Sequence, residues 1–324
     1  MQTHLKRLAN LLLFLCVAFA IDPVAAQNYP SKPLRMIVPL AAGGSSDLLA
    51  RTIAQALSDA LGQPVIVDNR VGAGGVVGVQ AAAKAPADGY TILFGSNMTM
   101  AANTFLYKNV PFDPLKDFSP LSAIANVQVA LVTSVFGPVA TTQELIALAK
   151  AKPSELNYGA GTASALICTE TFKSAAGIEI AKVPYRGSAQ ALTDLIAGRI
   201  QLVCEPLPTA LQMVKSGKLR SLGVMSNSRS PFAPDWPTFA EAGIRGAVHP
   251  AWVALYIASG TPKEIEVKLV NVLGDVLRNP TIKDKIKAGL WEEITIGPEY
   301  LDRITRAEIV RLEKLVKDAN ISPE

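Results

Sequence analysis

Three turns rich in glycine, serine and threonine carry the residues of this sequence that could do chemistry. They lie at 42–46, 95–99 and 159–164, and each follows a predicted strand and opens a predicted helix. Helix N-termini present unpaired N–H groups and partial positive charge, glycine lets a ligand approach the backbone, and hydroxyls add donors. Such turns can hold an anion without lysine or arginine. The candidate ligand contacts are Ala42, Gly43, Gly44, Ser45, Ser46, Asp47, Ser96, Asn97, Thr162, Ala163, Ser164 and Glu205.

Two of these candidates are acidic, and each has a second interpretation. Asp47 stands at the start of a predicted helix, where a carboxylate offsets the helix dipole; alternatively, it accepts a hydrogen bond from a ligand donor or a bound water. Glu205 follows the predicted strand that ends at Val203, and it would disfavour a ligand carboxylate there unless it is neutralised. Alternatively, Glu205 is a solvated carboxylate at a strand end.

Familiar catalytic and cofactor motifs do not fit this sequence. The run that starts at Gly72 places Val77 where a dinucleotide-binding motif needs its third glycine, and no GxxxxGK[ST] or GxSxG motif occurs. His249 is the one histidine beyond residue 26, and a lone histidine is more often structural than catalytic. We therefore predict a binding protein with no catalytic residue, no cofactor and no metal site.

The composition and the N-terminus limit the class of protein. The chain has 324 residues, of which 49% are hydrophobic and 18% charged, with a net charge of +4. This composition indicates a soluble globular protein, and no dense basic cluster suggests a nucleic-acid partner. Lys6 and Arg7 precede an apolar run at 11–21 that is too short to span a bilayer, and small residues follow at 24–26. This pattern predicts a signal peptide that is cut after Ala26, and hence a periplasmic protein.

Two cysteines, Cys168 and Cys204, remain beyond the predicted signal peptide. In an oxidising compartment they could form a disulfide. Alternatively, they are two buried apolar thiols, which is a common fate of cysteine in a core. Their spacing alone does not decide between a bond and free thiols.

Strand and helix signals alternate along the rest of the chain. Short β-rich runs at 34–38, 65–68, 90–94, 179–183, 200–204 and 219–225 are separated by helical patterns. This alternation predicts an α/β fold with mostly parallel sheets flanked by helices, so that the three turns share the carboxyl edges of the sheets. A long β-rich stretch at 124–135 predicts a connection between two lobes. We expect a signal peptide at 1–26, a first lobe at 27–126 and 248–324, and a second lobe at 127–247.

Short motifs through the chain carry a resemblance to a known family. They lie in order at 29–33, 39–47, 69–75, 87–91, 108–118, 183–187, 239–243 and 258–262. Together they resemble the Bug family, the periplasmic solute receptors of tripartite tricarboxylate transporters. The resemblance implies a two-lobed periplasmic-binding-protein fold of the second type, which closes around a small carboxylate held by backbone N–H groups, hydroxyls and water. It also implies the membrane permease subunits of the transporter as partners.

The second lobe departs from the family pattern. The loop at 158–172 is shorter than usual, and Cys204, Glu205 and Pro206 stand where the family often has Phe-Asp-Asn. A less polar wall would suit a ligand with an apolar or aromatic end. We therefore expect a monomeric receptor that captures a small organic carboxylate between the lobes and delivers it to a permease. The alternatives are a secreted ligand sensor that feeds a membrane kinase and a secreted α/β enzyme that processes a carboxylate.

Overall fold

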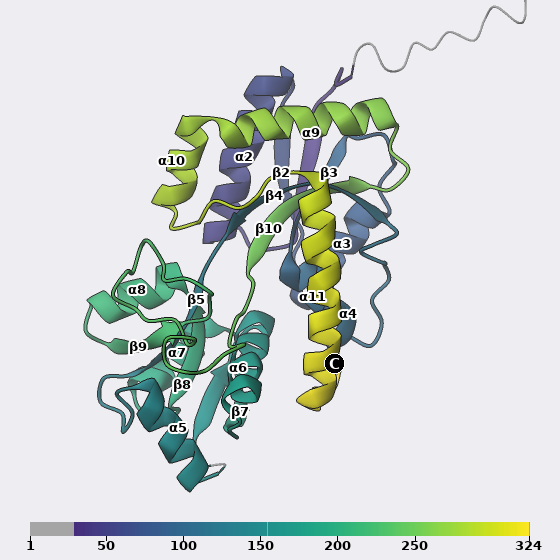
Figure 1. Ribbon diagram of the computed structural model, residues 1–324. Coiled ribbons are helices and arrows are strands. Elements are labelled where there is room, and N and C mark those ends of the chain that lie inside the picture. The colour runs from purple at the N-terminus through teal and green to yellow at the C-terminus, as the bar shows by residue number, and fades with distance from the viewer. Residues whose placement is uncertain (1–28, 154, 324) are drawn as a thin grey trace, which may run out of the picture.

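The computed structural model describes residues 29–153 and 155–323, and it has two α/β lobes joined by two passages of the chain (Figure 1). The predicted signal peptide at 1–26 and its cleavage site lie outside the described residues. Within the part of the chain that is described, no helix combines the length and apolarity needed to cross a membrane.

A five-stranded mixed sheet forms the first lobe, in the order β2-β1-β3-β10-β4. Its strands are β1 (Leu34–Val38), β2 (Val65–Asn69), β3 (Thr91–Ser96), β4 (Phe118–Asn126) and β10 (Trp252–Ala258). The predicted parallel pairing is present where β1 lies between β2 and β3. The strand β10 runs antiparallel to β3 and β4, because the chain enters it from the second lobe. The carboxyl ends of β1 and β3 therefore share one edge with the start of β10.

Helices cover both faces of the first sheet. Their bounds are α2 (Ser45–Leu61), η1 (Ala73–Gly75), α3 (Val76–Ala83), η2 (Met98–Ala102), α4 (Asn103–Leu106), α9 (Lys263–Arg278), α10 (Pro280–Ala288) and α11 (Pro298–Asp318). Successive side chains of a strand point to opposite faces, so Met36 packs in the core with α2 and α9 while Ile37 packs in the core with α3 and α11.

The second lobe repeats this plan around a sheet of order β7-β6-β8-β5-β9. Its elements are β5 (Val129–Ser134), α5 (Thr142–Ala151), β6 (Asn157–Ala160), α6 (Ala163–Ala176), β7 (Ala181–Pro184), α7 (Ser188–Ile196), β8 (Leu202–Pro206), α8 (Leu207–Lys215) and β9 (Leu219–Val224). The strand β6 is parallel to β7 and β8, so the turns that open α6 and α7 emerge at one edge. The predicted α/β architecture with two lobes is thus confirmed. The prediction of mostly parallel sheets is wrong, because each sheet has two parallel and two antiparallel pairs: β10 and β5 run against their neighbours.

Two passages of the chain connect the sheets, and the helix α11 contacts both lobes. The first is short, at 127–128 between β4 and β5, and the second runs from β9 to β10 at 225–251. The helix α11 starts against the first sheet and runs down beside α6 of the second lobe (Figure 1). There Leu312 and Leu315 share an apolar cluster with Ala101 and Ile167. The predicted lobe limits at 126/127 and 247/248 stay a prediction.

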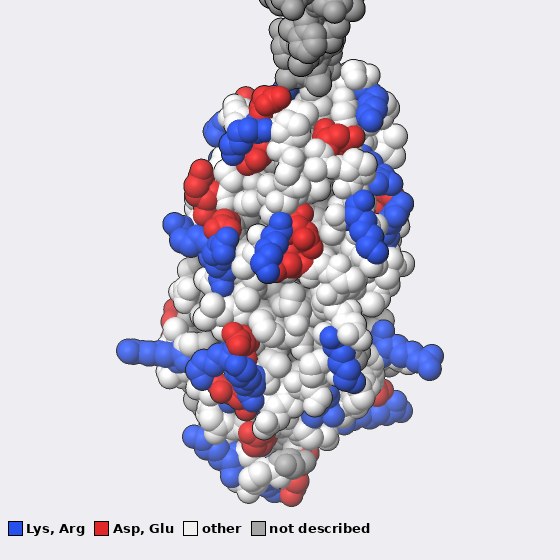
Figure 2. Space-filling view, turned by 90° about the vertical axis from the view of Figure 1, so that its right-hand side faces the viewer, with Lys and Arg blue, Asp and Glu red and all other residues white. Residues whose placement is uncertain are grey.

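Charged side chains are mixed on the face of the molecule that Figure 2 presents. Basic and acidic groups alternate there, and neither sign gathers into a continuous patch. Short-range ion pairs also pair opposite charges along single helices, as between Arg306 and Asp302 on α11.

Candidate functional site

The turn between β1 and α2 is shaped by a glycine and an aspartate. Gly43 has a φ of +85°, a left-handed conformation that glycine adopts without strain. Its N–H donates to Asp47 Oδ2 at 2.9 Å, and Arg51 Nε donates to the same oxygen at 2.9 Å. Gly44 occupies the N-cap of α2 and no side chain caps that end. The first N–H groups of α2 therefore lie beside an exposed turn made by residues 42–45.

Asp47 uses both carboxylate oxygens within the first lobe. Its Oδ1 accepts a hydrogen bond from Asn69 Nδ2 at 2.8 Å, in addition to the two bonds at Oδ2. Burial by itself would raise the pKa of Asp47, but the hydrogen bonds from Arg51, Gly43 and Asn69 together hold the pKa below its usual value. The observed bonds thus support a role for Asp47 in shaping the turn, and its predicted direct contact with a ligand stays a prediction.

The end of β3 places a second pair of candidates at the same edge. The Ser96 N–H donates to Thr99 Oγ1 at 2.9 Å, which closes a tight turn into η2. Asn97 is buried, and its Nδ2 donates to the carbonyl oxygen of Pro250 at 2.6 Å. Pro250 lies on the second passage between the lobes, so this bond attaches the first-lobe edge to that passage.

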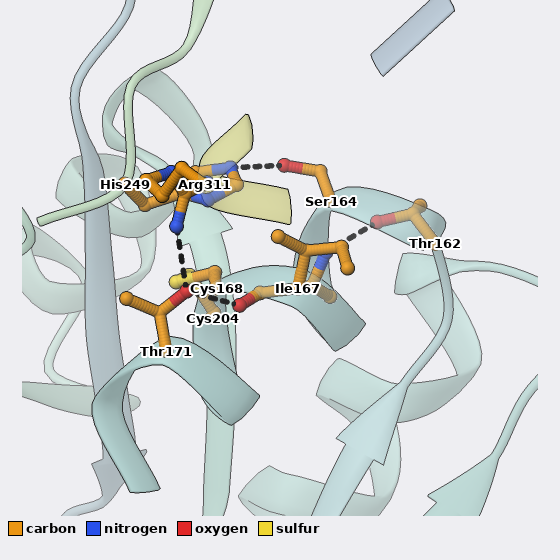
Figure 3. Close-up of a disulfide and its surroundings, with 9 residues drawn as sticks. Thr162, Ser164, Ile167, Cys168, Thr171, Cys204, His249 and Arg311 are labelled. Atoms are coloured by element: carbon orange, nitrogen blue, oxygen red, sulfur yellow. Dashed lines mark hydrogen bonds between the residues drawn. A yellow bond between two sulfur atoms is a disulfide. The ribbon is translucent and has the colours of Figure 1, made fainter. Parts of the chain in front are cut away.

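In the second lobe, the turn that opens α6 has the same polar character (Figure 3). Thr162 caps the helix, since its Oγ1 accepts from the N–H of Ala165 at 3.1 Å. The Ser164 Oγ lies 3.2 Å from Nε2 of His249. Ala163 shares an apolar cluster with Met98, the residue that follows Asn97. The turn at 162–164 therefore lies close to the turn at the end of β3.

Gly161 allows two second-lobe turns to meet. A Cβ at this position would lie 2.6 Å from the carbonyl carbon and oxygen of Gly187 and 2.8 Å from the backbone nitrogen of Ser188. No side chain fits into that space, because the obstructing atoms belong to backbone. The absence of a side chain at Gly161 thus brings the N-terminal turns of α6 and α7 together.

Glu205 lies at the carboxyl end of β8, close to the start of α7. Its side chain is 2% exposed, and its Oε1 has no hydrogen-bond partner. Burial raises the pKa of Glu205, and the hydroxyl of Ser188 partly offsets this effect. The interpretation of Glu205 as a solvated strand-end carboxylate is therefore wrong, because neighbouring elements cover the side chain.

A disulfide joins two of the elements that form this edge. Cys168 on α6 and Cys204 on β8 are bonded, with their Cα atoms 6.3 Å apart (Figure 3). The choice that the sequence left open is thus resolved in favour of the bond. It ties the first half of α6 to the strand that carries Glu205.

Consecutive residues of the second passage bring the two lobes' candidates together. His249 contacts Ser164 of the second lobe, and Pro250 contacts Asn97 of the first lobe. The parallel neighbours β1 and β3 bring the turn at 42–46 to the same first-lobe edge. Glu205 lies with Ser188 at the second-lobe edge, and the described contacts do not link it to the first lobe.

Sequence reasoning missed a cavity at the two passages between the lobes, which together form the hinge. Its volume is about 480 Å³, and none of the predicted ligand contacts lines it. Its polar lining includes Gln128, Ser226, His249, Glu308 and Arg311. Glu308 is almost fully buried and forms a two-bond ion pair with Arg311, at 2.7 and 2.8 Å. The spacing of Glu308 and Arg311 along one helix is the signal that could have indicated this pair.

Burial keeps His249 neutral. It lowers the pKa of the imidazole to about 3, and the positive charge of Arg311 adds to this effect. The described residues contain no group of three histidine, cysteine or acidic side chains that could hold a metal ion. The contacts described at the meeting point of the lobes are hydrogen bonds, from Asn97 to Pro250 and between Ser164 and His249.

Two α/β lobes on a double hinge, with polar helix-opening turns from both lobes at that hinge, define a two-lobed solute receptor. Comparison with known proteins agrees with this class. The chain belongs to the family described as tripartite tricarboxylate transporter family receptor, which matches residues 49–321. The family is one of receptors and not of enzymes.

Three similar proteins illustrate this membership. BugT of Bordetella pertussis is 35% identical over 316 residues, which cover 97% of each chain. The structure of Rpa4515 of R. palustris with adipate has a TM-score of 0.81 and 36% identity, and the match covers 92% of this chain and 100% of that one. The periplasmic binding protein BugD has a TM-score of 0.76 and 30% identity, with 91% and 100% covered. The predicted Bug-type receptor fold is confirmed.

Proposed function

We propose that this receptor captures a small organic carboxylate between its lobes and delivers it to the membrane permease of a tripartite transporter. The observation that carries the proposal is a pair of hydrogen bonds at the hinge. Ser164 of the second lobe bonds His249, and Asn97 of the first lobe bonds the next residue, Pro250. A carboxylate at this junction would reach N–H and hydroxyl donors of both lobes, and closure would bury it. The adipate in the similar Rpa4515 structure supports this ligand class.

In this proposal the ligand has two ends with different surroundings. One carboxylate binds the exposed turn made by Ala42, Gly43, Gly44, Ser45 and Ser46, with Ser96 alongside. The turn made by Thr162, Ala163 and Ser164 contacts the other end, together with Glu205. Because Oε1 of Glu205 is buried without a partner, that end of the ligand should offer a hydrogen-bond donor. A second ligand carboxylate would bind there only with an extra proton.

The test is a thermal-shift screen of the refolded, ligand-free receptor against mono-, di- and tricarboxylates, aromatic acids, amino acids and neutral amides. A ligand at 100 times its Kd stabilises the folded state by about 2.7 kcal/mol. We expect one class of carboxylate to raise the Tm and to be recovered unchanged at one equivalent. Consumption of the ligand would contradict the receptor function and favour the enzyme alternative. Hits confined to neutral or cationic compounds would contradict the anion site.

The role of Glu205 is tested with adipate and 6-hydroxyhexanoate, which differ only at one end. We expect the receptor to prefer the hydroxy acid, and the Glu205→Gln variant to lose that preference. An equal preference in both proteins would remove Glu205 from the ligand site.

Export and delivery are the remaining parts of the proposal. N-terminal sequencing of the exported chain should begin at Gln27 if the signal peptide is cut after Ala26. Cross-linking in membranes that contain the permease subunits should capture the receptor with ligand more than without it. Size-exclusion chromatography with light scattering should report a monomer. Capture by a membrane kinase in place of a permease would favour the sensor.

A further inference from the structure

The residues Val248, His249 and Pro250 form a short segment that touches both lobes. The His249 N–H donates to the carbonyl oxygen of Met225 at 2.9 Å, which holds the segment against the start of the second passage. Its imidazole reaches Ser164 at the start of α6, and the Pro250 carbonyl accepts from Asn97 after β3. Any bending of the hinge along this segment would therefore act on both turns.

The His249 side chain has a single hydrogen-bond partner in the described structure. It is 3% exposed, and while Nε2 lies beside the Ser164 hydroxyl, Nδ1 has no partner. A neutral imidazole has one donor and one acceptor nitrogen, so one bond to Ser164 can fix the direction of the serine hydroxyl. In either tautomer, the ring thus occupies one hydrogen-bonding position of Ser164 Oγ and restricts where the remaining positions of the hydroxyl can point.

The rest of α6 is fastened by other groups. The disulfide ties Cys168 to β8, and Arg311 of α11 donates from Nη1 to Thr171 Oγ1 at 3.3 Å (Figure 3). These contacts lie one and two turns beyond Ser164 along the helix. The helix body is therefore held independently of His249, and the contact that ties the Ser164 side chain to the hinge is the one with the imidazole.

We propose that His249 is a positioning residue for ligand binding, which orients the Ser164 hydroxyl toward the interlobe site and links it to the hinge. The inference rests on the proposed function, because Ser164 is one of the proposed ligand contacts. Through Pro250, the same segment holds Asn97 on the first lobe. A ligand that contacts both turns would thus favour the hinge geometry in which both bonds are formed.

The test is a double-mutant cycle with adipate as the probe and calorimetric affinity as the readout. Loss of one hydrogen bond to the ligand lowers affinity by roughly 5- to 10-fold, so we expect this loss for Ser164→Ala. His249→Leu should give a similar loss, and it should add nothing in the Ser164→Ala background. His249→Gln, whose amide can occupy the place of Nε2, should recover most of the affinity. Asn227→Ala, an exposed change on the same passage, is the matched control and should have no effect.

Hydrogen exchange without ligand gives an independent readout. The peptide that covers 162–167 should exchange faster in His249→Leu and Ser164→Ala than in the unaltered receptor, while the peptide after Cys168 should not change. If adipate does not bind, this comparison decides the proposal, and unchanged exchange at 162–167 overturns it.

The outcomes separate this proposal from the proposed function. A loss of affinity in Ser164→Ala with no loss, or an additive one, in His249→Leu overturns the positioning role and leaves the carboxylate site intact. Unchanged affinity for adipate in Ser164→Ala removes this serine from the site and overturns the positioning role of His249, whereas the carboxylate-binding function stands because adipate still binds. Equal and non-additive losses with recovery in His249→Gln support the positioning role.

Discussion

Removing the Cys168–Cys204 disulfide should destabilise the receptor by a calculable amount. The bond links residues 36 apart in the sequence, and it constrains the unfolded chain. In the chain-entropy relation, a loop of this length contributes about 4 kcal/mol at room temperature. Both sulfurs lie in the apolar core of the second lobe, so a Cys168→Ala/Cys204→Ala variant replaces them with small apolar groups. We expect its free energy of unfolding to be lower by about 4 kcal/mol.

The assay is urea unfolding together with thermal unfolding, each with and without dithiothreitol. For a chain of about 300 residues the entropy of unfolding is about 0.6 kcal/mol per kelvin, so the Tm should fall by about 6 °C. The reductant should lower the Tm of the unaltered receptor by a similar amount and leave that of the variant unchanged. Cys168→Ala alone should match the double variant, because either change removes the same bond.

Two results would refute this reasoning. A loss below about 1 kcal/mol in the double variant would mean that the unfolded chain is little constrained by the bond. A large effect of reductant on the double variant would mean that the reagent acts elsewhere. Either result would remove the disulfide from the account of how the second-lobe edge is held.

Three further predictions follow from buried or tightly packed groups. Because the pKa of His249 falls from 6.5 to about 3 on folding, the unfolded chain binds more protons between these pH values, and stability declines as pH falls. Urea unfolding should show that this group lowers the free energy of unfolding by about 2 kcal/mol between pH 7.5 and pH 5. This part of the pH dependence should disappear in His249→Gln, and an unchanged pH dependence in that variant would contradict the buried neutral imidazole. Arg311→Gln leaves the carboxylate of Glu308 buried and unpaired, so it should lower the free energy of unfolding by about 3 kcal/mol. Glu308→Gln should recover most of this loss in the same background, and an additive second loss would argue against the pair. Gly161→Ala should lower carboxylate affinity by at least about 10-fold because it separates the turns of α6 and α7. Gly187→Ala, whose Cβ has open space, should bind normally. Equal effects of the two changes in calorimetry would show that the close approach of Gly161 to the α7 turn does not matter for binding.

Local patterns were sufficient to predict much of the fold. The β-rich run at 34–38 became β1, and the glycine-rich turn after it opens α2 with Gly43 at positive φ. Such features depend on side chains a few residues apart, which is the range over which strand alternation, turn geometry and helix capping operate. Ordered motifs also predicted the receptor family, which the comparisons confirm.

The candidate site could be predicted only in part. Thr162 as a helix cap follows from local chemistry, since its acceptor serves a residue three positions later. Asp47 illustrates the limit, because Arg51 is one turn away on the same helix while Asn69 reaches it from β2. Both carboxylate oxygens of Asp47 thus have hydrogen-bond partners. This could be seen only in the folded structure, because one of these partners comes from a different element.

The sequence by itself determined which segments are strands and helices, which turns can present N–H groups, and to which family the chain belongs. Only the tertiary structure decided which of those turns meet. Ser164 and His249 are 85 positions apart and Asn97 and Pro250 are 153 apart, and the two passages between the lobes bring them together. Burial at that junction also determines the protonation of His249, because the imidazole loses water while a guanidinium lies nearby. Neither contact leaves a local pattern in the sequence, because each partner belongs to a different element of the fold.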